Sequence, residues 1–187
     1  MLPLTPVQIL WVNMITAVTL ALALAFEPPE PGVMRRPPRD PRASILDGVF
    51  LWRIAFVSVL IGGATIAVFL VAQHLEAPLD LARTMAVNTL VLGQVFYLFN
   101  TRFIDESSLR PALWRANPIA WLAVGVLLVL QLAFVYAPVM HLWFGSAPVE
   151  GRHWFLPLGI GMAVFLLVEV EKAILRRVRQ ARGSTRR

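Results

Sequence analysis

Cysteine is absent from this sequence of 187 residues, and charged residues make up only 15% of it. Without cysteine the chain forms no disulfide, no thiol nucleophile and no cysteine-ligated metal site. Hydrophobic residues make up 58% of the sequence and are gathered into long blocks, which argues against a soluble globular domain. The composition is therefore typical of a membrane protein.

The motifs of nucleotide chemistry are also missing. The sequence has no glycine-rich phosphate loop, no aspartate in an Asp-Lys-Thr-Gly setting and no histidine–acid pair in a hydrolytic arrangement. The longest segment between apolar blocks has about 22 residues, too few for a soluble domain. The three histidines, His74, His141 and His153, fall between these blocks, where scattered interfacial side chains are more common than a shared metal site.

Apolar blocks of about 20 residues recur along the chain, and a helix of that length crosses the hydrocarbon core of a bilayer. We predict an all-α membrane protein, a bundle of five transmembrane helices. The spans are expected at about 7–26, 49–72, 84–100, 119–140 and 155–175, the third being the shortest and most polar. Together they form a single membrane domain over residues 1–187, with a basic tail at 176–187.

Arginine is distributed unevenly among the segments that connect these spans. The first and third loops and the tail are rich in arginine, whereas the second and fourth loops contain only Arg83, at a span edge, and Arg152. Because arginine-rich loops stay in the cytoplasm, the N-terminus is expected outside and the tail inside. The net charge of +6 is thus a topology signal, and nucleic-acid binding is not expected.

Neutral polar residues interrupt two of the predicted spans. Asn13 and Thr16 are three residues apart and share one helix face, and Gln94 lies inside the third span. Their oxygens suit a path for a desolvated cation. Alternatively they hydrogen-bond to neighbouring helices or, for Thr16, to the carbonyl of the preceding turn. The residues alone leave both interpretations open.

Charged residues stand near the cytoplasmic ends of the second and fifth spans. Arg53, Glu169 and Glu171 can extend towards the interface, and Lys172 can pair with Glu169 at a spacing of three. A structural role is favoured for them, and a proton relay is the alternative.

The first span and the loop after it resemble the sixth transmembrane helix and following loop of type-II P-type cation-transporting ATPases. This group contains the calcium pumps and the sodium/potassium pumps. The resemblance is carried by "QILWVN", "FEPPEPGVM" and "RRPPR". It continues through "WRIAF" in the seventh helix, "MAVNTLVLGQVFYLFNTR" in the eighth, and two further helices before the basic tail.

The resemblance implies a C-terminal membrane domain that contributes to the ion pathway of a pump and anchors its helix bundle. The implied partners are the lipid bilayer, the transported cation, and the remaining helices and cytoplasmic domains of the pump. ATP and Mg would be cofactors of the complete pump and not of this chain. The implied location is the plasma (inner) membrane. The alternative is a non-transporting scaffold or regulatory subunit derived from such a domain.

The resemblance also implies which residues line the ion path. An Asn-x-x-Thr-Asp pattern in the sixth helix of the family falls here on Asn13, Thr16 and Ala17, so alanine replaces the acid. An acidic ligand in the eighth helix of calcium pumps matches Gln94. The implied site therefore keeps neutral oxygens and lacks carboxylates, and either other helices supply the charge or the ion is monovalent.

We expect the purified 187-residue chain by itself to hydrolyse no ATP, because it carries no phosphorylatable aspartate in a suitable motif. The measurement is phosphate release and acid-stable phosphoenzyme formation, against a blank prepared from cells without the chain. An ATPase rate above that blank, or an acyl-phosphate adduct, would contradict the expectation.

Overall fold

The computed structural model describes residues 2–26, 48–101 and 117–184, and its regular structure there is entirely helical. The predicted all-α class is confirmed for this part of the chain. The helices are α1 (Pro6–Ala25), α2 (Gly48–His74), α3 (Leu79–Thr101), α5 (Pro118–Tyr136), α6 (Pro138–Phe144), the short 3₁₀ helix η2 (Gly151–Trp154) and α7 (Phe155–Ser184).

Four helical segments within the described ranges are long and apolar enough to cross a membrane: α1, residues 50–74 of α2, α5, and residues 151–174, which include the first part of α7. The predicted span at 84–100 falls on α3. That helix is long enough, at 23 residues, but it is less apolar than α1, α2 and α5 and is not among these four segments. The predicted count of five membrane-spanning helices is therefore not confirmed.

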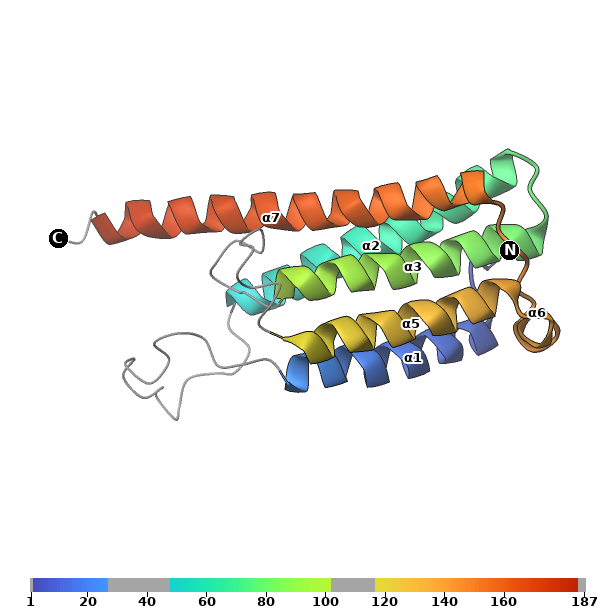
Figure 1. Ribbon diagram of the computed structural model, residues 1–187. Helices are drawn as coiled ribbons and strands as arrows, with labels where there is room; N and C mark the ends of the chain where they lie inside the picture. Colours follow the sequence, from blue (N-terminus) through green and yellow to red (C-terminus); the bar gives the residue numbers. More distant parts are fainter. Residues whose placement is uncertain (1, 27–47, 102–116, 185–187) are drawn as a thin grey trace.

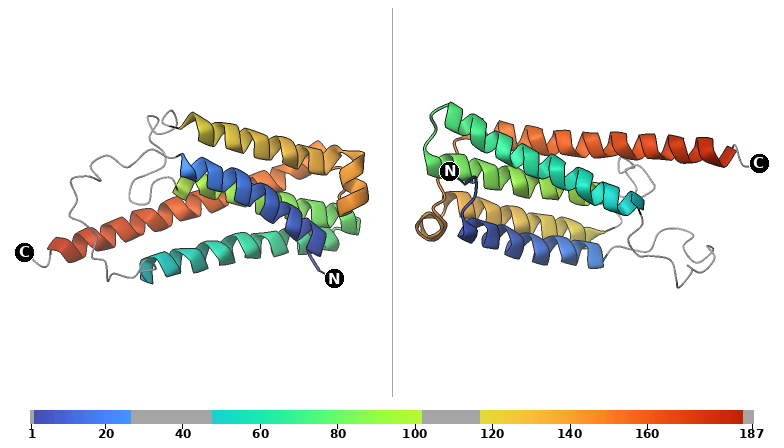
Figure 2. Two further views of the ribbon diagram at one scale, coloured as in Figure 1. Left: turned by 90° about the horizontal axis from the view of Figure 1, so that it is seen from below. Right: turned by 180° about the vertical axis from the view of Figure 1, so that it is seen from behind.

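The five long helices lie side by side, and α3 has the central position (Figures 1 and 2). It packs against α2 and α7 on one side and against α1 and α5 on the other, while α1 also packs along α5. The turn between α2 and α3 lies at the same end of the bundle as the start of α1 and the short helix α6 (Figure 1).

Hydrogen bonds at the helix starts join α1 to the C-terminal half of the chain. Thr5 caps α1 in a reciprocal pair with Gln8, and the buried Gln8 side chain also donates to the Phe144 carbonyl at 3.0 Å. Asn117 caps α5 and donates to the Ala23 carbonyl near the end of α1, at 3.1 Å. The first bond joins the start of α1 to α6, and the second joins the end of α1 to the start of α5.

The end of α5 differs from the predicted span of 119–140. Pro138 has no backbone N–H and disfavours helical geometry at the residue before it. Ala137 accordingly adopts an extended conformation, with φ −78° and ψ 126°, and α5 ends at Tyr136. Residues 138–140 belong instead to α6, which ends at Phe144 and is capped by Gly145 with φ +60°.

The core contains both apolar side chains and the polar side chains of α3. Trp11 stacks on Phe134 with ring centroids 5.8 Å apart, within a buried cluster that joins α1, α3 and α5. In the same interior, Asn88 of α3 accepts a hydrogen bond of 2.6 Å from Gln131 of α5. This polar side chain of α3 thus faces a neighbouring helix and not the outside of the bundle.

Two glycines of α7 are close in sequence but differ in their surroundings. At Gly161, an added Cβ would lie 2.5 Å from a ring carbon of Phe96, so α7 and α3 are in close contact there. At Gly159, which is exposed, an added Cβ would meet nothing within 4 Å. Of these two glycines, Gly161 is therefore the one that close packing of α7 against α3 requires.

We expect Gly161→Val to destabilise the protein and Gly159→Val to leave its stability nearly unchanged. Overpacking a close contact costs about 1–3 kcal/mol, because rigid groups such as the Phe96 ring have to move. The thermal unfolding midpoint of each variant in detergent, compared with the unsubstituted protein, checks this. Equal loss of stability in the two variants would mean that valine harms α7 itself and that the Phe96 contact is not the cause.

Candidate functional site

A groove of about 470 Å³ lies between α1 and α3. Asn13 and Thr16 line it from α1, and Gln94 lines it from α3. All three residues singled out in the sequence as a cation path are therefore brought to one groove. The rest of the lining consists of Ala17, Leu20, Ala21, Leu24, Tyr97, Leu98 and Thr101.

On the α1 side, the two polar residues differ in their surroundings. Asn13 is exposed, whereas Thr16 is buried and its hydroxyl donates to the Val12 carbonyl at 2.8 Å. This is the bond to the preceding turn that the sequence offered as an alternative to ion binding. A hydroxyl that donates one hydrogen bond still has lone pairs that accept or coordinate, so Thr16 has both capacities.

Thr19 provides a comparison on the same helix. It is buried, and its hydroxyl donates to the Ile15 carbonyl at 2.6 Å, as Thr16 does to Val12. Thr19 does not line the groove. The two threonines thus make the same local bond, and only Thr16 presents its oxygen at the groove wall.

On the α3 side, Gln94 has a side-chain oxygen without a partner. Its Oε1 atom is buried and accepts no hydrogen bond from any residue that the structure describes. A buried carbonyl oxygen without a donor or a cation is unfavourable by about 1–3 kcal/mol. Gln94, a residue that lines the groove, therefore carries a buried acceptor that no described donor satisfies.

Tyr97 and Thr101 are lining residues that the sequence reasoning missed. They follow Gln94 at spacings of three and seven, which place all three on one face of a helix. This helical spacing from Gln94 is visible in the sequence, and it could have indicated that Tyr97 and Thr101 share a face with Gln94. Among the residues that the structure describes, the groove lining contains hydroxyl and amide groups and no carboxylate, and Ala17 stands where the resemblance implied an acid.

The charged residues near the ends of α2 and α7 are paired in the structure. Lys172 donates to Glu169 at 2.8 Å, which confirms the predicted local pair. Arg53 of α2 bonds Glu171 of α7 at 3.3 Å, and Asn100 of α3 donates to the Phe165 carbonyl of α7 at 3.0 Å. These contacts join α2, α3 and α7, as the structural interpretation expects.

The comparisons with known proteins identify one family and several relatives. A family model described as "Cation transporting ATPase, C-terminus" matches residues 1–174. The "Probable cation-transporting ATPase F" of Mycobacterium tuberculosis (strain H37Rv) is 39% identical over 184 residues, covering 95% of this chain and 19% of the relative. The "Calcium-transporting ATPase" of Bacillus subtilis (strain 168) is 35% identical over 172 residues, covering 89% and 19%. The chain thus spans about a fifth of the length of these curated relatives.

Proposed function

Because the chain belongs to the family of cation-transporting ATPase C-termini, we propose that it forms the C-terminal membrane part of a cation pump and supplies one wall of the ion path. The observation that carries this proposal is the groove between α1 and α3, which Asn13, Thr16 and Gln94 line together. Residues with neutral oxygens line it from two helices, and the Oε1 atom of one of them, Gln94, is buried without a partner among the described residues. In this proposal, a cation that has lost its water would take these oxygens as ligands.

The rest of the pump has to complete the site. A dehydrated divalent cation is normally balanced by carboxylates, and the described lining of the groove has none. Carboxylates from helices outside these 187 residues would close the groove, or the ion would be monovalent. ATP and Mg would act on the cytoplasmic domains of that larger protein, and this chain would pass the resulting helix movements to the ion path.

We further propose that α3 is a fifth membrane-spanning helix of an integral membrane protein in the plasma (inner) membrane. It lies alongside helices that are apolar enough to cross (Figure 1), and its polar residues Thr84, Asn88, Thr89 and Asn100 are buried. The low hydropathy of α3 is compatible with crossing, because its neighbours shield it from lipid. The arginine-rich segments would face the cytoplasm and the turn between α2 and α3 the outside.

We expect Asn13→Ala and Thr16→Val to lower the apparent affinity of the complete pump for its cation by about tenfold each. An oxygen that contacts a charge contributes about 1.5 kcal/mol or more, and both substitutions remove one. The measurement is ion-stimulated ATPase activity with calcium, sodium and potassium in separate titrations. Thr19→Val is the matched control, since it removes the same local bond on the same helix away from the groove.

Two outcomes would count against this role. If Asn13→Ala and Thr16→Val both retain the affinity and transport of the unsubstituted pump, the residues are packing groups, and hydrogen bonding within and between helices is their role. If Thr19→Val loses as much affinity as Thr16→Val, the effect belongs to the stability of α1 and not to the groove.

Orientation is tested by labelling single cysteines from outside the cell, which the absence of native cysteine makes straightforward. We expect Gly151→Cys to react with a membrane-impermeant maleimide and Ser44→Cys to react only after permeabilisation. Gly151 is exposed and has room for a side chain, whereas Ser146 in the same loop is buried and donates to the Phe134 carbonyl. The reverse labelling pattern would refute the proposed orientation.

A further inference from the structure

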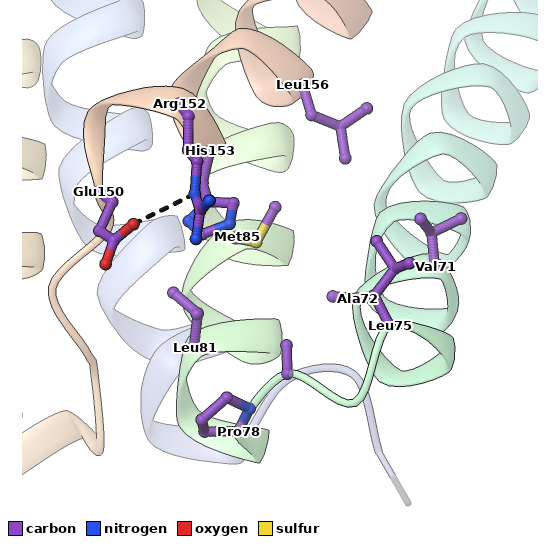
Figure 3. Close-up of a pocket in the computed structure, with 11 residues that line it drawn as sticks. Val71, Ala72, Leu75, Pro78, Leu81, Met85, Glu150, Arg152, His153 and Leu156 are labelled. Atoms are coloured by element: carbon purple, nitrogen blue, oxygen red, sulfur yellow. Dashed lines mark ion pairs between the residues drawn. The ribbon is translucent and has the colours of Figure 1, made fainter.

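A second hollow, which we name the end pocket, lies where α2 ends, α3 begins and η2 leads into α7 (Figure 3). Its volume is about 310 Å³. Its apolar lining comes from three helices and the turn between two of them, and its polar lining comes from the segment before α7. The residues are Val71, Ala72, Leu75, Ala77, Pro78, Leu81, Met85, Glu150, Arg152, His153 and Leu156.

The polar side of the end pocket presents both signs of charge. Arg152 bonds Glu150 at 3.2 Å, with 76% and 70% of the two side chains exposed, so both remain accessible to a ligand. His153 lies beside Arg152 (Figure 3), and its Nδ1 atom is buried without a partner among the described residues. The accessible polar groups of the end pocket are therefore the guanidinium of Arg152 and the carboxylate of Glu150, which suit a ligand that carries both signs of charge.

The apolar side of the end pocket continues onto the outer surface of the bundle. Leu75 is 73% exposed, Val71 is 48% exposed and Leu156 is 38% exposed. They lie at the ends of two segments that are apolar enough to cross a membrane. A ligand with a charged head and an apolar tail would match this arrangement, and the end of a membrane-spanning helix lies at the level of the lipid headgroups.

We infer that the end pocket binds the headgroup of an amine-bearing zwitterionic phospholipid, the class of phosphatidylethanolamine. The phosphate accepts hydrogen bonds from Arg152, and the ammonium group donates to Glu150. The acyl chains follow Val71, Leu75 and Leu156 towards the hydrocarbon core. The inference rests on the embedding of the chain in a membrane and not on an ion path in the α1–α3 groove.

The balance of charge in the end pocket favours this lipid class over two others. An anionic headgroup such as phosphatidylglycerol would bring its negative charge close to Glu150 without offering an ammonium group in return. Phosphatidylcholine has a cation without N–H donors, so it makes no hydrogen bond to the carboxylate. A soluble amino phosphate has the charges but would leave the apolar lining unfilled.

The test measures which lipids the intact protein retains. The protein that contains this chain is purified in detergent and exposed in turn to phosphatidylethanolamine, phosphatidylcholine and phosphatidylglycerol, and bound lipid is counted by native mass spectrometry. We expect phosphatidylethanolamine to be retained most. Arg152→Gln and Glu150→Gln should each reduce its retention about two- to fivefold, as for the loss of one exposed charge contact. Glu76→Gln, an exposed acid at the same end that does not line the end pocket, is the control and should change nothing.

A second measurement keeps the result interpretable if a variant is poorly folded. Added phosphatidylethanolamine should raise the thermal unfolding midpoint of the unsubstituted protein and of Thr16→Val equally, and should raise that of Arg152→Gln by less. Phosphoethanolamine without acyl chains should neither raise the midpoint nor displace the lipid.

The inference is overturned by any of three results: preference for phosphatidylglycerol, equal retention of all three lipids, or an equal loss of retention in Glu76→Gln. Displacement by phosphoethanolamine would assign the end pocket to a soluble ligand. Because Thr16→Val tests the groove and leaves the end pocket intact, failure of the ion-path proposal and failure of the lipid inference are distinguishable.

Discussion

The polar side chains of α3 are buried between the other long helices, and the positions of those helices follow from this burial. Thr84, Asn88, Thr89 and Asn100 are each at most 1% exposed. The large exposed apolar residues lie mainly on the surrounding helices, as with Val59, which is 75% exposed. An unsatisfied polar group in lipid costs several kcal/mol, roughly the effect of a large core mutation, so a helix of this composition is stable only inside the bundle.

Neighbouring elements give hydrogen-bond partners to part of these polar groups, while the Nδ2 atom of Asn88 and the Oδ1 atom of Asn100 have none among the described residues. Asn88 pairs with Gln131 of α5, and Asn100 donates to a carbonyl of α7. Thr84 donates to the carbonyl of Asp80 and accepts from the backbone of Ala147. Each bond joins residues far apart in sequence or closes a local turn, so together they set the register of the helices. The Oε1 atom of Gln94 has no such partner, and it belongs to a residue that lines the groove.

The two hollows differ in the chemistry that the packing leaves open. In the α1–α3 groove, the polar atoms are neutral oxygens set among small and apolar side chains, which suits a cation with further ligands from elsewhere. In the end pocket, the guanidinium of Arg152, the carboxylate of Glu150 and the imidazole of His153 lie at the edge of an apolar surface. Away from both hollows, the Arg53–Glu171 ion pair joins α2 to α7.

The sequence by itself determined the helical class, the places of the long helices and the shared face of Asn13 and Thr16, because hydropathy and spacing are properties of a single segment. It did not determine that Gln94 lies across the same groove, or that Gly161 and not Gly159 contacts Phe96. Contacts between helices depend on how each helix is rotated about its axis and how far it slides along its neighbour. Side-chain packing fixes those two quantities, so they were decided only by the tertiary structure.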